Sequence, residues 1–65
     1  MTICIIHESG TFWTNAESVV NVVDNIKAGA NEIDVWWFAG QGQRYRESMW
    51  FDPEHLIAVR TESDD

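Results

Sequence analysis

Residues 33–51, IDVWWFAGQGQRYRESMWF, predict a β-hairpin. Apart from one aspartate, β-branched and aromatic residues fill 33–38, which is typical of a strand. Residues 39–43 contain two glycines, which supply the positive φ angles that tight turns need. Residues 44–51 then return as a second strand, and because strand side chains alternate between two faces, both faces of this hairpin carry large apolar groups.

The segment after the hairpin predicts one helical turn and a last strand. Asp52 can accept a hydrogen bond from the backbone that follows it, and Pro53 suits the first position of a turn. Residues 56–60 are apolar enough for a closing strand. The sequence SMWFDPEHLIAV, residues 48–59, resembles the end of SH3-like and Sm-like small barrels and of short uncharacterised bacterial and phage proteins. This resemblance covers the last third of the chain and implies a fold without implying an activity.

The segment before the hairpin predicts two strands. Residues 2–8 are rich in isoleucine on both faces, which indicates a strand in the middle of a sheet. Ser9 and Gly10 form a turn signal, and residues 11–13 pair back onto the first strand.

One helix is expected over about residues 15–28. The valine and isoleucine residues of this segment follow the spacing of one buried stripe: Val19, Val22, Val23 and Ile26. Thr14 or Asn15 can cap its start, and Glu17 can close a capping box with Thr14. Gly29 ends the helix in the left-handed conformation.

These elements predict an α+β fold with a five-stranded antiparallel, curled SH3-like sheet, one α-helix and a one-turn helix before the last strand. Residues 1–61 form a single small domain, and residues 62–65 form an acidic, frayed tail. The helix between the second and third strands departs from the plain SH3 layout, so closure of a barrel stays open.

Charge and composition exclude several classes of protein. Eleven acidic residues against four basic ones give a net charge of −7, which opposes direct binding to nucleic acid. No apolar run approaches the length of a membrane span, and residues 1–6 read as a strand without a basic leader. A single cysteine, Cys4, permits no internal disulfide and fits a reducing, cytoplasmic setting.

Neither a metal site nor an active site is expected. Cys4, His7 and His55 are the thiol and imidazole ligands available, and the spacing of Cys4 and His7 places them on opposite faces of a strand. Cys4 with a histidine and Asp52 would form a nucleophilic group, but burial in an isoleucine-rich strand makes a thiol inert. We therefore expect no cofactor, no metal and no enzymatic activity.

The candidate binding surface is one face of the predicted hairpin. If Ile33, Val35 and Trp37 face the core, two arginines lie beside exposed rings on the other face, and such residues are frequent in binding hot spots. The candidate residues are Trp36, Phe38, Arg44, Arg46 and Trp50. Two alternatives remain: the helix covers this face and makes the tryptophans core residues, or the register differs.

The excess of aromatic residues without reactive groups predicts a protein-binding module. Four tryptophans, three phenylalanines and one tyrosine are more apolar surface than so small a core is expected to hide. The expected partner is another protein, as for a phage-type or accessory inhibitor, with a homodimer or higher homo-oligomer as one form of association. The alternatives are an acidic mimic of nucleic acid that blocks a DNA-binding protein, and an oligomer that sequesters a nucleotide on Trp36 or Trp50.

Overall fold

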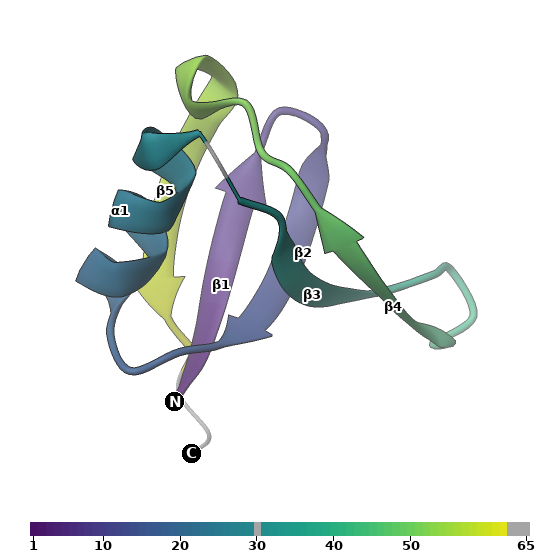
Figure 1. Cartoon of the computed structure of the whole chain (residues 1–65). Helices are drawn as coiled ribbons and strands as arrows, with labels where there is room; N and C mark the ends of the chain where they lie inside the picture. Colours follow the sequence, from purple (N-terminus) through teal and green to yellow (C-terminus); the bar gives the residue numbers. More distant parts are fainter. Residues whose placement is uncertain (30, 63–65) are drawn as a thin grey trace.

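The computed structural model describes residues 1–29 and 31–62 and forms an α+β fold (Figure 1). Its elements, in chain order, are β1 (Thr2–His7), β2 (Gly10–Asn15), α1 (Val19–Ala28), β3 (Ile33–Phe38), β4 (Arg44–Met49), the 3-10 turn η1 (Pro53–His55) and β5 (Leu56–Thr61). Of the predicted frayed tail, residues 62–65, Glu62 is described, and its backbone N–H donates to the carbonyl oxygen of Thr2, so it does not fray; residues 63–65 lie outside the described residues. Among the described residues, no helix is long and apolar enough to cross a lipid bilayer.

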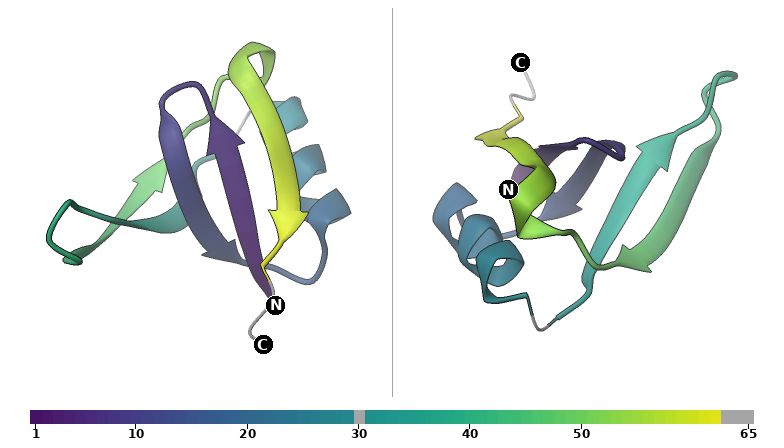
Figure 2. Two further views of the ribbon diagram at one scale, coloured as in Figure 1. Left: turned by 180° about the vertical axis from the view of Figure 1, so that it is seen from behind. Right: turned by 90° about the horizontal axis from the view of Figure 1, so that it is seen from above.

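All five strands belong to one antiparallel sheet in the order β4-β3-β2-β1-β5. β1 is an interior strand, paired with β2 on one side and with β5 on the other, as its two apolar faces predicted, and three of its six residues are buried. β4 and β5 lie at the two edges. Figure 2 shows that β1, β2 and β5 form the body of the sheet, whereas the β3–β4 hairpin extends away from it.

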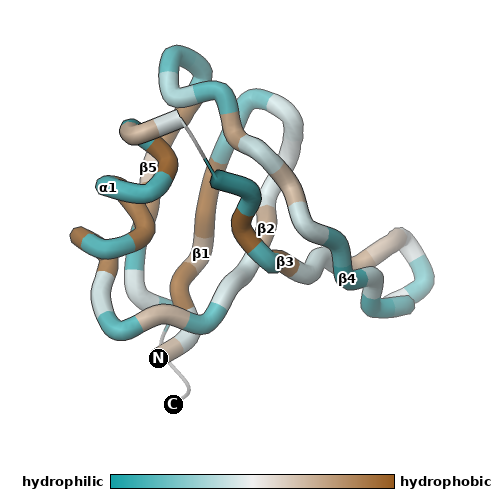
Figure 3. Tube along the Cα trace, in the orientation of Figure 1, coloured by the Kyte–Doolittle hydropathy of each residue, from teal (hydrophilic) through white to brown (hydrophobic). Residues whose placement is uncertain are grey.

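The hydrophobic core lies on one face of the sheet, which we call the inner face. Ile5 lies opposite Phe12, and the stripe of α1 packs against them through Val22 and Ile26. Val35 of β3 joins the same cluster. The predicted stripe of α1 is confirmed at Val22 and Ile26, which are buried, and at Val19, which packs against the core, whereas Val23 is only partly buried. The brown bands of β1 and α1 in Figure 3 show the apolar residues of these two elements.

α1 begins later than predicted. β2 continues to Asn15, which pairs with Thr2, so Thr14 and Asn15 lie in a strand and cannot cap the helix. Ser18 is the N-cap, and its side chain accepts a hydrogen bond from the backbone N–H of Asn21. Gly29 ends α1 at φ 68°, as predicted.

The hairpin strands present the predicted faces, but β4 is shorter than predicted. Ile33 lies opposite Met49 and Trp36 opposite Arg46. Continued by one residue, this register would place Trp50 opposite Glu32, which precedes β3, so β4 has no strand to pair with beyond Met49. The chain then turns: Phe51 enters the core, and the Asp52 carboxylate accepts from Glu54 to start η1, as predicted.

β2 and β3 pair at one position only, Trp13 with Trp36. Next to this pair the hydroxyl of Thr14, which is buried, donates to the carbonyl oxygen of Asp34 at 2.7 Å. A side chain thus takes the place of a backbone donor where the hairpin leaves the body of the sheet. Thr14 is the buried polar residue of the described chain.

Candidate binding surface

The outer face of the sheet gathers aromatic rings and arginines where β2, β3 and β4 lie side by side. Register places Trp13, Trp36 and Arg46 in one row across it, because directly paired residues share a face. Phe38 and Arg44 form the next row on the hairpin. We call the five residues Trp13, Trp36, Phe38, Arg44 and Arg46 the arginine–aromatic face.

Specific contacts hold this face together. The guanidinium carbon of Arg44 lies 4.9 Å from the centre of the Trp36 ring, within the range of a cation–π interaction. The Phe38 ring meets Trp13 edge to face at 5.5 Å. These contacts fix the orientation of the rings, and side chains that are already ordered lose less entropy in an interface.

α1 does not cover this face, because α1 packs on the inner face with Ile3, Ile5 and Val35. The alternative that the helix buries these tryptophans is therefore wrong. Phe38 is 52% exposed, Trp13 and Trp36 are partly exposed, and Arg44 and Arg46 are exposed. None of the four tryptophans of the chain is buried.

Four of the five predicted site residues come together, and Trp50 does not. Trp50 lies beyond the end of β4, and its indole N–H donates to the carbonyl oxygen of Gly29 at the end of α1, at 2.9 Å. Its ring is 52% exposed, but it lies by the helix instead of beside Arg46. Trp13 takes its place on the face, which sequence reasoning missed because the register of β2 against β3 leaves no short-range signal.

The charge of this face is opposite to that of the chain. Arg44 and Arg46 lie on it, and Arg60 of β5, opposite the buried Cys4, extends it across the sheet. Asp34 lies on the same face in the neighbouring row, opposite Ser48, and its carboxylate accepts a hydrogen bond from the hydroxyl of Ser48. Three of the four basic residues of a chain with net charge −7 therefore share one side of the sheet.

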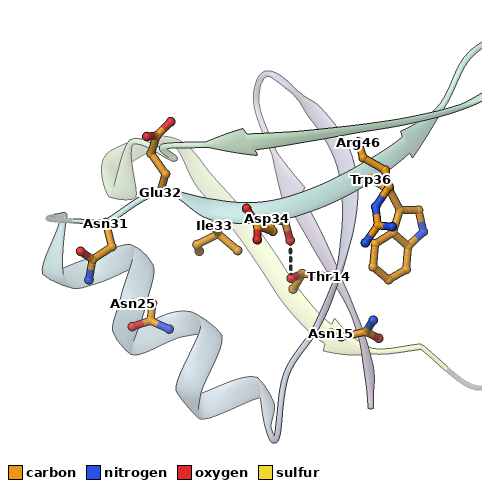
Figure 4. A pocket seen from close by; sticks show the side chains of 9 residues that line it. All are labelled: Thr14, Asn15, Asn25, Asn31, Glu32, Ile33, Asp34, Trp36 and Arg46. Carbon is orange, nitrogen blue, oxygen red and sulfur yellow. Dashed lines mark hydrogen bonds between the residues drawn. The ribbon is translucent and has the colours of Figure 1, made fainter.

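Two open hollows border the face. One of about 670 Å³ lies between α1 and the start of β3, where Trp36 and Arg46 line it together with the acidic Glu32 and Asp34 (Figure 4). The other, of about 490 Å³, lies where β2 and β3 diverge beyond Trp13 and is lined by apolar rings that include Phe38. Both are surface hollows and neither contains a group of reactive side chains.

A second cluster of polar groups joins η1 to the β1–β2 turn. The backbone N–H of Ser9 donates to Nδ1 of His7 at 3.1 Å, so Nδ1 is the unprotonated nitrogen and Nε2 donates to the carbonyl oxygen of Asp52 at 2.9 Å. His55 contacts the Asp52 carboxylate at 2.7 Å and that of Glu8 at 3.6 Å. His7 and Asp52 are 45 positions apart in the sequence, so no local pattern could have predicted this cluster.

One carboxyl group and one imidazole of this cluster, those of Asp52 and His55, have shifted pKa values. The N–H of Glu54 and the ring of His55 lower the pKa of Asp52, because both stabilise its charged form. The hydrogen bond to Asp52, its charge and the charge of Glu8 raise the pKa of His55. When its ring is protonated, His55 thus pairs with the carboxylates of Asp52 and Glu8 and forms a clasp between η1 and the turn.

The described residues offer no assembled catalytic or metal-binding group. Cys4 is buried in β1 with 1% of its surface exposed, as predicted. It lies on the outer face and His7 on the inner face, so the thiol and the imidazole point apart, also as predicted. Within residues 1–29 and 31–62, no three histidine, cysteine, aspartate or glutamate side chains are placed to hold a metal ion.

Comparison of the chain with protein-family models, with curated proteins and with solved structures gives no match.

Proposed function

We propose that this protein is a small, non-catalytic binding module that recognises another protein through its arginine–aromatic face. The observation that carries the proposal is the Arg44–Trp36 pair on a sheet face that no helix or strand of residues 1–29 and 31–62 covers. Tryptophan and arginine are enriched where binding energy concentrates, because they combine large apolar area with charge. An accessory or phage-type inhibitor that acts in the cytoplasm by covering a partner's surface is the role that fits this face best.

The chemistry of the face selects the partner. Arg44 and Arg46 offer planar donors that match carboxylates. The rings of Phe38 and Trp13 offer apolar area next to them. A partner with acidic groups around an apolar centre would therefore be preferred, and a second copy of the chain is one form of partner that light scattering distinguishes.

The alternatives find less support. An acidic mimic of nucleic acid needs carboxylates gathered along one side, whereas acids such as Glu17, Glu47 and Glu54 lie in separate parts of the fold: before α1, on β4 and in η1. A nucleotide stacked on Trp36 with its phosphates in the adjoining hollow would meet the carboxylates of Glu32 and Asp34 beside Arg46, and these like charges repel the phosphates. An SH3-like relationship stays part of this proposal and is compatible with any of these roles, because small barrels have many unrelated functions.

The test uses two substitutions of equally exposed rings. Phe38 and Trp50 are each 52% exposed, but only Phe38 lies on the arginine–aromatic face. We expect Phe38→Ala to abolish retention of partner proteins in affinity capture from the source cells, and Trp50→Ala to preserve it. Circular dichroism of both variants establishes that they are folded.

Equal retention by Phe38→Ala and by the wild type would contradict the proposal. Loss with Trp50→Ala alone would move the binding surface to the end of α1. Multi-angle light scattering at several concentrations, with the same two variants, tests self-association through the face.

A further inference from the structure

β4 is an edge strand whose outer side is open. Its residues from Arg44 to Ser48 are all exposed, and among the described strands only β3 pairs with it. An exposed edge offers unpaired N–H and C=O groups to which another strand can add. Charged side chains along such an edge determine which strands can pair with it.

The backbone groups that face outward can be assigned from the hairpin. The N–H of Ala39 donates to the carbonyl oxygen of Gln43 at 2.8 Å. Ala39 and Gln43 are thus a hydrogen-bonded pair, and hydrogen-bonded and non-hydrogen-bonded pairs alternate along an antiparallel ladder. Counting from this pair, Tyr45 and Glu47 exchange backbone hydrogen bonds with β3, and Arg44 and Arg46 do not. Arg44 and Arg46 therefore direct their N–H and C=O groups to the free edge. The Asp34 carbonyl, which faces Thr14 on the β2 side of β3, agrees with this assignment.

The side chains along this edge have a defined order of chemistry. Arg44 and Arg46 lie on the outer face and are two residues apart. Tyr45 lies between them on the inner face, 45% exposed and stacked on Trp37 at 5.7 Å. Glu47 follows on the same inner face. A strand added to the edge thus meets positive, aromatic, positive and negative side chains in turn.

We propose that β4 binds an extended segment of another protein as a sixth, antiparallel strand, and that this segment carries acidic, apolar, acidic and basic residues opposite Arg44, Tyr45, Arg46 and Glu47. The proposal rests on the proposed function and specifies how the partner binds there. Directly opposed residues share a face, so both acidic residues would meet arginines beside Trp36. Because the added strand runs antiparallel to β4, its residue opposite Glu47 comes first, and the recognised sequence from N- to C-terminus is Lys-Glu-Val-Glu.

A second copy of the chain is a poor occupant of this edge. In the two symmetric registers that pair most of β4, Arg46 lies opposite Arg46, or Glu47 opposite Glu47, of the second copy. Like charges in direct opposition destabilise a strand pair. The charges on β4 therefore oppose self-pairing while they favour an acidic strand, which is why the proposal commits to a different protein.

The test is an NMR titration with the capped peptide Thr-Lys-Glu-Val-Glu-Thr. We expect the amide signals of Arg44 and Arg46 to shift most, and the charge-reversed peptide Thr-Glu-Lys-Val-Lys-Thr to bind at least about tenfold more weakly. The double variant Arg44→Glu/Arg46→Glu should reverse this preference. No shift in β4 at millimolar peptide, or equal affinity of the two peptides, would overturn the proposal, and so would tighter binding of an oligothymidine than of the acidic peptide.

N-methylated peptides test the strand pairing itself. Methylation of both glutamate amides removes the donors that face Arg44 and Arg46, and should weaken binding at least about tenfold. Methylation of the valine amide, which points away from β4, is the matched control and should leave binding within about twofold. Equal effects of the two methylations would refute the added strand, while the outcome with Phe38→Ala would still decide the proposed function by itself.

Discussion

Replacement of Thr14 by valine tests the hydrogen bond that ties the hairpin to the body of the sheet. Valine has nearly the same shape as threonine but no hydroxyl, so the 2.7 Å bond to the Asp34 carbonyl is lost while the buried volume stays filled. A carbonyl left without its donor costs about 1–3 kcal/mol. Because β2 and β3 pair only at Trp13 and Trp36, no neighbouring ladder bond compensates.

Urea unfolding followed by tryptophan fluorescence measures this loss. Thr11→Val is the matched control, because Thr11 lies on the same strand, is exposed, and makes no hydrogen bond through its hydroxyl within the described residues. We expect Thr14→Val to be less stable than Thr11→Val by about 1–2 kcal/mol, or at least about 4 °C in Tm for a domain of this size. A difference below about 0.5 kcal/mol would show that the hydroxyl does not hold β2 to β3.

Two further substitutions probe the clasp at η1 and the end of α1. Because folding lowers the pKa of Asp52, its contribution to stability is present above pH 3.8, the ordinary pKa, and is lost as the pH falls through the lowered pKa of the folded protein. Because folding raises the pKa of His55, its contribution is present below pH 6.5, the ordinary pKa, and is lost as the pH rises through the raised pKa of the folded protein. The midpoint of urea unfolding should therefore be highest between these pH values, and His55→Gln should remove the decline on the alkaline side; an unchanged pH profile in the variant would exclude the clasp. Gly29→Ala should cost about 1 kcal/mol in the same assay, because φ is 68° while an added Cβ meets no atom within 4 Å; a stability equal to that of the wild type would show that α1 ends differently in solution.

Patterns local in the sequence predicted most of the fold. Alternation in residues 33–38 and 44–49 predicted the hairpin and the side chains that share each face, and in the structure Ile33 and Met49 pair on the inner face. The valine spacing of α1 and the Asp52–Pro53 turn depend on neighbours within one or two helical turns, and both are confirmed. These are the features that a short window of sequence contains.

The predictions from sequence were wrong or incomplete where contacts between segments far apart in the sequence determine the structure. Thr14 has the chemistry of a helix cap, but pairing of β1 with β2 up to Asn15 keeps it in the sheet, where Asp34 uses its hydroxyl. Trp50 alternates correctly with Arg46 but has no partner strand. The polar cluster around His7 joins residues that are far apart in sequence. The sequence could therefore place Trp36, Phe38, Arg44 and Arg46 together, but it could not exclude Trp50 or add Trp13.

The N–H of Glu62 donates to the carbonyl oxygen of Thr2 at 2.9 Å, so the end of β5 lies beside the start of β1. Figure 1 places this point away from the loop of the β3–β4 hairpin. A carrier protein or a surface tether attached at either end would thus be anchored at the same corner of the molecule. Immobilised or displayed forms of the protein can therefore leave the hairpin and its edge free for measurement in both orientations.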